Sequence, residues 1–160
     1  MNRRRFVACI ALAWAPAVLA NESLCLQGER VAFSCTIASK TASVCQGAEG
    51  LTYRFGAPSK VEMVFPRDAK ERQAGYRPLH QPLIGGGMTA LVFQRGAFEY
   101  RVYSKVERSA AGDVPAFEDG VEVWRDGKRI ASRPCDDGGE GFRGDVDQLV
   151  NAVPATMPAK

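Results

Sequence analysis

TALVFQRGAFEYRV, residues 89–102, places aromatic and aliphatic side chains at alternate positions on both sides of a central Arg95-Gly96 pair. Alternation with a period of two is typical of β-strands that bury one face. A two-residue turn at Arg95-Gly96 aligns these positions across a hairpin, so that one face of both strands is apolar. The predicted pairs on this face are Phe93 with Phe98, Leu91 with Tyr100 and Thr89 with Val102. We therefore predict an antiparallel sheet that contains this hairpin.

Four shorter segments before the hairpin follow the same period of two. They span Val31–Ile37, Thr41–Gln46, Leu51–Phe55 and Val61–Phe65, and turn residues separate them. Four short strands in so short a stretch are typical of an antiparallel meander.

Two further elements are predicted toward the C-terminus. Asp126-Gly127 is a turn pair that tolerates positive φ, and it predicts a second hairpin. Asp145 and Gln148 have the spacing of a helix N-cap pair, and they predict a short helix over Val146–Val153. The pairs expected in the second hairpin are Val123 with Ile130 and Val121 with Ser132.

Residues 67–87 lack the strand pattern. Pro78, Pro82 and three consecutive glycines interrupt any strand there, and residues 67–72 form a charged run. We predict a long surface loop, with one helical turn near Ala69–Gln73. Loops of this length without regular structure are uncommon and are often functional.

Together these elements predict an all-β fold. We expect an antiparallel sandwich or small barrel of about eight short strands with one short C-terminal helix. No repeat or low-complexity tract divides the sequence. We predict a single domain over residues 21–153, followed by a flexible tail over residues 154–160.

The first twenty residues have the composition of an export signal. Arg3, Arg4 and Arg5 precede an uncharged apolar stretch that ends in Ala-Val-Leu-Ala, and this predicts cleavage after Ala20. The whole chain has 21 Lys and Arg against 18 Asp and Glu, a net charge of +3, so loss of the three arginines leaves a balanced chain. A balanced chain has no basic surface for nucleic acid. We predict a periplasmic or secreted protein that, after cleavage, has no membrane segment.

The predicted mature chain keeps four cysteines, Cys25, Cys35, Cys45 and Cys135. An even number in an exported chain indicates disulfides, and four cysteines allow three pairings. Cys35 and Cys45 point to opposite faces of the predicted sheet, because side chains alternate along strands, and this argues against their pairing. Both remaining patterns link Cys135 to the N-terminal region.

The candidate binding residues lie in the predicted loop. They are Tyr76, Arg77, His80, Gly85, Gly86 and Gly87. His80 is the only histidine of the chain, and it has no obvious acidic partner in sequence. We interpret the three glycines as the approach to a strand rather than as a phosphate loop, because a strand and not a helix follows them.

We predict no catalytic residue, no metal and no cofactor. Residues 136–147 have the length of a calcium-binding loop, but Gly138 and Asp147 stand at positions that usually hold an acidic or amide ligand and a glutamate. We interpret this segment as a polar connector. The cysteine spacings of ten, ten and ninety residues are unlike those of zinc sites.

Short motifs in the first half of the chain carry a resemblance. They are Phe33-Ser34-Cys35, Lys40, Ser43-Val44-Cys45 and Tyr53-Arg54-Phe55-Gly56. With this series the chain resembles a group of small, uncharacterised exported proteins of Gram-negative bacteria, and the resemblance implies a periplasmic location and no site residues. In size, signal and cysteine usage the chain is also similar to periplasmic C-type lysozyme inhibitors, which are small antiparallel barrels. Their Ser-Gly-x-x-Tyr inhibitory loop has no match in it.

We expect a binding or interaction module that presents residues 67–87 to an envelope protein or a cell-wall enzyme, because rigid sheets commonly carry function on their loops. An inhibitor of a cell-wall lytic enzyme such as lysozyme is the first alternative. A hydrolase that uses His80 with an acidic residue brought near by folding is the second. A carboxylate within hydrogen-bond reach of His80, inside a concave pocket, would favour the hydrolase.

Overall fold

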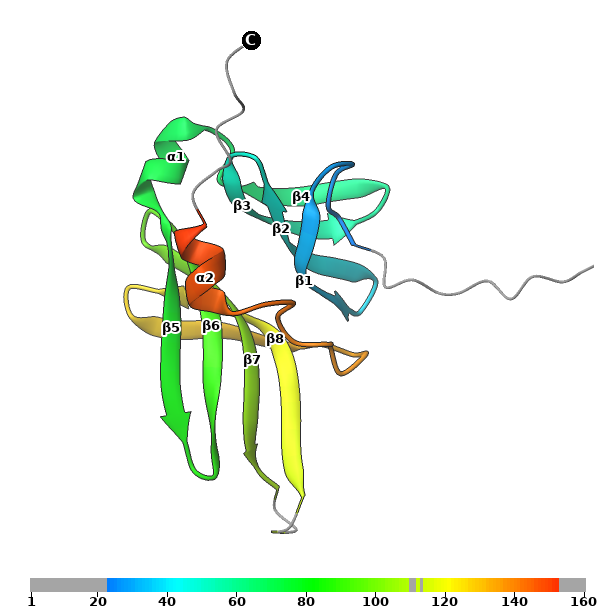
Figure 1. Cartoon of the computed structure of the whole chain (residues 1–160), viewed down its shortest axis with the longest axis vertical. Coiled ribbons are helices and arrows are strands. Elements are labelled where there is room, and N and C mark those ends of the chain that lie inside the picture. Colours follow the sequence, from blue (N-terminus) through cyan, green and yellow to red (C-terminus); the bar gives the residue numbers. More distant parts are fainter. Residues whose placement is uncertain (1–22, 110–111, 113, 153–160) are drawn as a thin grey trace, which may run out of the picture.

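The computed structural model describes residues 23–109, 112 and 114–152, and these form two antiparallel sheets and two short helices (Figure 1). The N-terminal sheet contains, in order, β1 (Arg30–Ile37), β2 (Lys40–Gly47), β3 (Gly50–Ala57) and β4 (Lys60–Phe65). The C-terminal sheet contains β5 (Tyr76–Leu83), β6 (Gly86–Arg95), β7 (Phe98–Arg108), β8 (Pro115–Arg125) and β9 (Lys128–Pro134). The helices are α1 (Ala69–Ala74), between β4 and β5, and α2 (Val146–Asn151), after β9.

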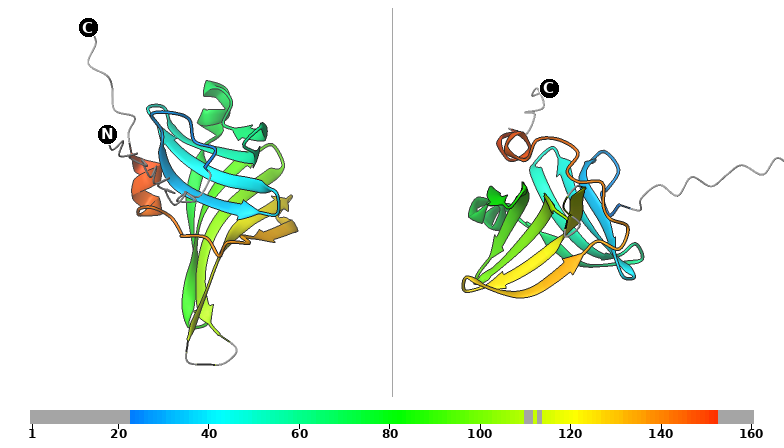
Figure 2. Two further views of the ribbon diagram at one scale, coloured as in Figure 1. Left: turned by 90° about the vertical axis from the view of Figure 1, so that its right-hand side faces the viewer. Right: turned by 90° about the horizontal axis from the view of Figure 1, so that it is seen from below.

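The predicted all-β class is confirmed, and the architecture is a sandwich. The two sheets face each other, as the side view in Figure 2 shows, and no strand of one sheet pairs with a strand of the other within the described residues. The barrel alternative is therefore wrong. Alternating side chains from both inner faces fill the space between the sheets. The largest of the fully buried residues are Tyr53, Phe33, Phe65, Phe93, Leu51 and Leu91.

Strand β5 occupies much of the segment that we predict as a loop over residues 67–87, so that prediction is wrong. Pro78 and Pro82 pair with Leu91 and Gly87 on β6, and β5 is the edge strand of its sheet. An edge strand tolerates proline, because its outward amide positions need no partner. The helical turn predicted near Ala69–Gln73 is confirmed as α1.

The hairpin of β6 and β7 turns one residue later than predicted. The turn is Gly96-Ala97, and Gly96 has a φ of 60°, which glycine adopts without strain. The later turn shifts each pairing by two residues, so the predicted partners are wrong while the predicted core face is kept. The observed pairs are Phe93 with Tyr100, Leu91 with Val102 and Thr89 with Ser104.

The second hairpin turns at Asp126-Gly127 as predicted, with φ values of 50° and 75°. Its predicted partners are wrong, because a β-bulge lies between Val123 and Trp124. Ile130 is the extra residue of this bulge and is 54% exposed. Val123 consequently pairs with Ala131 rather than Ile130, and Val121 pairs with Arg133 rather than Ser132.

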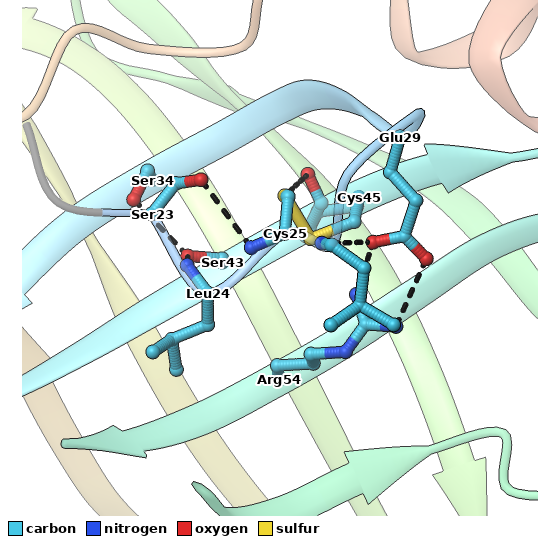
Figure 3. Close-up of a disulfide and its surroundings, with 10 residues drawn as sticks. Ser23, Leu24, Cys25, Glu29, Ser34, Ser43, Cys45 and Arg54 are labelled. Atoms are coloured by element: carbon cyan, nitrogen blue, oxygen red, sulfur yellow. Dashed lines mark hydrogen bonds and ion pairs between the residues drawn. A yellow bond between two sulfur atoms is a disulfide. The ribbon is translucent and has the colours of Figure 1, made fainter. Parts of the chain in front are cut away.

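The four cysteines form two disulfides, Cys25–Cys45 and Cys35–Cys135. This confirms the prediction that Cys35 and Cys45 are not paired. Figure 3 shows that the first bond fixes the segment before β1 to the outer face of the N-terminal sheet, where the Leu24 amide also donates a hydrogen bond to Ser43 Oγ at 3.0 Å. Two disulfides indicate an oxidising environment, extracellular or periplasmic. Neither helix of the described residues is long and apolar enough to cross a membrane.

Helix α2 begins as predicted. The Asp145 side chain caps it by accepting a hydrogen bond from the Gln148 amide at 2.9 Å, and Val146 and Leu149 are buried against the core. Asn151 is its last residue, and Val153 of the predicted helix lies outside the described residues. So do the predicted signal over residues 1–20 and the predicted tail over residues 154–160.

Candidate functional site

The C-terminal sheet is longer than the sheet that faces it. In Figure 1 strands β5 to β8 run past the N-terminal sheet, and Figure 2 shows the same projection from the side. The inner face of β6 changes along this length, from the fully buried Phe93 and Leu91 to the half-buried Thr89 and Gly87. We call the projecting part of the inner face the open end. Strand register assigns to it His80, Pro82, Gly87, Thr89, Ser104, Val106 and Phe117.

The segment between β9 and α2 crosses the sheet where the open end begins. Its Gly141 amide donates a hydrogen bond to the buried Asp119 carboxylate at 2.5 Å, and its Phe142 ring lies 5.1 Å from the Phe33 ring in the core. Together with the start of α2, this segment and the open end line a cavity of about 350 Å³ that is open to solvent. Its side-chain lining includes His80, Thr89, Ser104, Phe117, Phe142 and Val146.

His80 lies between a carboxylate and a hydroxyl in this cavity. Its Nε2 is 2.8 Å from Asp147 Oδ2, in the first turn of α2, and its Nδ1 is 3.4 Å from Thr89 Oγ1, its cross-strand neighbour. With a proton on Nε2, the imidazole donates to Asp147 and accepts from Thr89. The His80 and Asp147 side chains are 54% and 51% exposed. The imidazole is thus oriented by its neighbours and accessible to a ligand.

Three of the predicted binding residues lie away from the cavity or serve the fold. The Tyr76 hydroxyl accepts a hydrogen bond from the Leu51 amide at 3.2 Å and so joins the two sheets. Arg77 lies on the outer face, 3.3 Å from Glu99. Gly85 is in the turn between β5 and β6, with a φ of 74°.

The other three predicted residues lie at or next to the open end. His80 and Gly87 both line the cavity. Gly86 begins β6, and a Cβ at this position would collide with the Val106 carbonyl. Gly86 therefore lets β6 and β7 approach closely, as expected for glycine at the start of a strand.

Thr89, Ser104 and Asp147 also belong to the site, and they were not among the predicted site residues. Thr89 and Ser104 continue the apolar faces of β6 and β7 as polar residues, and such a change is a signal that a face leaves the core. The predicted register hid this signal, because it paired Thr89 with Val102. Asp147 is 67 positions from His80, and no local pattern joins them.

On the outer face of the open end, the polar and charged side chains pair with one another. The Tyr103 hydroxyl donates to Glu118 at 2.7 Å, and Lys105 Nζ lies 3.1 Å from the same carboxylate. Burial, and then the hydrogen bond to Glu118, raise the pKa of Tyr103. Burial alone would raise the pKa of Glu118, but the Tyr103 and Lys105 hydrogen bonds hold it below its usual range. These groups already have partners and offer a ligand little.

The cysteine and glutamate side chains that cluster near the N-terminal sheet also have partners within the protein. In the part of the chain that the structure describes, the one cluster with metal-ligand geometry is Cys25, Glu29 and Cys45. Its two sulfurs form a disulfide, and Glu29 accepts two hydrogen bonds from Arg54, at 2.6 and 2.9 Å (Figure 3).

The carboxylates at the start of the segment interpreted as a polar connector have structural partners. Asp137 accepts from the Thr36 amide at 3.0 Å, and Asp136 accepts from the Ala38 amide. Both carboxylates therefore attach the connector to the end of β1.

Comparisons of the chain with protein-family models, with curated protein sequences and with solved structures found no match.

Proposed function

We propose that the chain is an exported binding protein that holds a partner protein of the bacterial envelope on its open end. The observation that carries this proposal is a group of exposed apolar side chains at the tip of the projecting strands. Ile84 is 87% exposed, Val114 is 67% exposed and Phe117 is 74% exposed. Large apolar side chains gathered on a small exported domain are typical of protein interaction surfaces.

Backbone hydrogen bonds bring these three residues to one end of the sheet. The Arg108 amide donates to the Ile84 carbonyl at 3.2 Å, and the Ser109 amide donates to the Val114 carbonyl at 3.3 Å. Phe117 follows on β8 and also lines the His80 cavity. Phe117 therefore links the apolar tip to the polar cavity, and apolar groups beside polar, water-accessible ones are the pattern of a protein interface.

The edge of β5 is a poor alternative as a binding surface. A partner that adds a strand to a sheet needs a run of free amides, and Pro78 and Pro82 remove two of them. The partner therefore sits on the inner face of the open end. This refines the expectation that residues 67–87 contact the partner, because His80 and Ile84 remain in the contact surface.

Export to the periplasm is part of the proposal. The two disulfides support an oxidising compartment, and the arginines and apolar run of residues 1–20 support a cleaved signal. The resemblance to small exported proteins of Gram-negative bacteria points to the same compartment.

Site-specific photo-cross-linking in intact cells tests the proposal. A benzoylphenylalanine at position 84 should capture one envelope protein, and the same probe at position 130 should not. Ile84 and Ile130 are both exposed isoleucines, so position 130 is a matched control. Adding Phe117→Ser should abolish capture from position 84 without unfolding the protein. Equal capture from both positions would refute the proposal.

The identity of the captured protein tests the inhibitor alternative. If that protein is a cell-wall lytic enzyme, the purified chain should slow its turnover at micromolar concentration, and Phe117→Ser should restore the rate. Lysozyme that keeps its full rate at the same concentration removes the lysozyme inhibitor from the alternatives.

One observation favours a hydrolase as a second candidate. His80 lies between Asp147 and Thr89 inside a concave cavity, so it has an orienting acid and a hydroxyl within reach. The hydrolase ranks second because the His80 and Asp147 side chains are each more than half exposed, and water screens the charges of exposed groups. Acid–base residues contribute about 10² to 10⁴ in rate. His80→Gln, Asp147→Asn and Thr89→Val should each reduce any hydrolysis of cell-wall fragments by such a factor, and equal rates would exclude this mechanism.

A further inference from the structure

A second cavity opens between the two sheets, away from the open end. Its volume is about 440 Å³, within the range of small-molecule sites. The side chains that line it include Phe55 and Met63 from the N-terminal sheet and Tyr100 and Val123 from the C-terminal sheet. Each of these four residues is only partly buried, so apolar surface of both sheets faces the same space. The cavity thus has apolar walls on two sides.

Tyr53 contributes an unpaired polar group to this cavity. The residue is 2% exposed, and its hydroxyl makes no hydrogen bond with any residue that the structure describes. Among these residues, the only fully enclosed side-chain oxygen or nitrogen without a partner is Ser109 Oγ. The Tyr53 hydroxyl is not among these enclosed atoms, so it is in contact with solvent-accessible space. Tyr53 lines the cavity, and we take the cavity to be that space. Burial, and then the Tyr100 hydroxyl, raise the pKa of Tyr53, so its hydroxyl keeps a proton to donate.

The charged groups that line the cavity are all positive. Lys40 and Arg133 belong to the lining, and no aspartate or glutamate does. Lys40 lies 5.5 Å from the centre of the Phe55 ring and 2.6 Å from Glu62. Arg133 is exposed and has no ion pair within the described residues. Of the two cations that could bind an anion here, Lys40 is paired with Glu62 and Arg133 has no ion pair within the described residues.

We propose that the cavity between the sheets binds an amphipathic carboxylate, a medium-chain fatty acid that carries a hydroxyl group. The acyl chain packs between Phe55, Met63 and Val123, where it removes apolar surface from water. The carboxylate binds Arg133 and Lys40 by charge-assisted hydrogen bonds. The hydroxyl accepts the hydrogen bond that Tyr53 otherwise leaves unmade. This site is independent of the open end and of the partner proposed for it.

Three matched probes test each part of this proposal by isothermal titration of the purified disulfide-bonded protein. They are 10-hydroxydecanoate, decanoate without the hydroxyl, and 1,10-decanediol without the charge. The first should bind most tightly, decanoate about fivefold more weakly and the diol at least tenfold more weakly, as expected for one neutral and one charge-assisted hydrogen bond.

Substitutions assign these differences to residues. Tyr53→Phe should bring 10-hydroxydecanoate to the affinity of decanoate, and it keeps the fold because the hydroxyl makes no bond in the protein. Arg133→Gln should weaken both acids about tenfold and leave the diol unchanged. Lys128→Gln, on the same strand β9 but outside the cavity lining, is the matched control and should change nothing.

A third variant makes the location of the site testable. Ala131→Trp, on the edge strand β9, should fill the cavity and abolish binding of all three probes, with the melting temperature measured to verify folding. No binding of any probe at millimolar concentration would overturn the proposal. Equal losses in Arg133→Gln and Lys128→Gln would also overturn it, as would full binding by Ala131→Trp.

Discussion

The covered half and the open end of the C-terminal sheet share the same strands but differ in what covers their inner face. On β6, Leu91 and Phe93 are fully buried against the N-terminal sheet, whereas Thr89, two positions earlier on the same face, borders a cavity. In the covered half, packing decides which side chains fit. The open end lacks that constraint on its inner face, so polar groups such as His80 are exposed there.

The open end is nevertheless supported, from its outer face. Leu79 and Leu83 of β5 pack with a small buried cluster of Met88, Ala90 and Tyr103. This cluster lies on the side opposite to the main core, because these positions alternate with His80, Thr89 and Ser104. A rigid platform with one free face results, and this is what a binding site requires.

Removal of the Cys35–Cys135 disulfide should have the largest effect on this comparison. The Cys35–Cys135 bond closes a loop of 100 residues and holds the segment that separates the covered half from the open end. The Cys25–Cys45 bond closes a loop of 20 residues within the N-terminal sheet. The chain-entropy model gives about 5 kcal/mol for the first and about 3 kcal/mol for the second. Urea unfolding of the Cys35→Ser/Cys135→Ser and Cys25→Ser/Cys45→Ser variants measures both. Equal losses of unfolding free energy in the two variants would show that loop length does not determine how much each disulfide stabilises the fold.

Two substitutions on β6 test the comparison directly. Phe93→Ala should lower the free energy of unfolding by about 4 kcal/mol, because it leaves a cavity among packed aromatic rings. Thr89→Val, which keeps the shape of the side chain, should change it by less than about 0.5 kcal/mol. Denaturant titration of both variants measures the difference. A Thr89→Val loss comparable to that of Phe93→Ala would mean that the open end belongs to the core.

Acid should weaken the N-terminal sheet through its Glu29–Arg54 ion pair. Burial alone would raise the pKa of Glu29, but the hydrogen bonds from Arg54 and the Leu26 amide and the Arg54 charge hold it below its usual value of 4.5. A lowered folded pKa contributes stability above 4.5, and this stability is lost as pH falls through the folded pKa. Glu29→Gln should cost about 2 kcal/mol at neutral pH and flatten the acid limb of a stability-versus-pH curve. An unchanged acid limb would contradict this account.

Asp147→Asn should have the smallest effect on stability, below about 0.5 kcal/mol, because the ion pair with His80 is exposed on both sides. Chemical shifts of the His80 ring should nevertheless change, since the carboxylate within 2.8 Å of it is replaced. A loss of stability as large as that of Glu29→Gln would show that the open end depends on this pair.

The sequence predicted the elements of the fold better than their partners. The period of two identified strands correctly from Val31 to Phe65, and the Asp145 cap located α2. The register failed wherever turn geometry added a residue, at Gly96-Ala97 and at the bulge of Ile130, because such local changes leave the alternation of side chains intact. Strand β5 was missed because proline breaks central strands but not edge strands.

The candidate site was predictable only in part. His80 stood out as a single histidine in an unusual segment, but its neighbours come from β6, β7 and α2. The contact with Asp147 depends on how the segment after β9 returns across the sheet, and the inter-sheet cavity depends on how two sheets stack. Both are properties of tertiary packing that no local window of sequence contains.

The two disulfides interleave along the chain, since Cys35 lies between Cys25 and Cys45 but is joined to Cys135, which lies beyond both. In a chain that emerges N-terminus first, Cys25 and Cys35 meet an oxidant well before Cys135, so oxidation of these neighbours in order would join them in a non-native bond. Thiol–disulfide exchange through a mixed disulfide would convert such a bond to the native pairing. We therefore expect the yield of correctly paired protein to depend on a disulfide isomerase as well as on an oxidase.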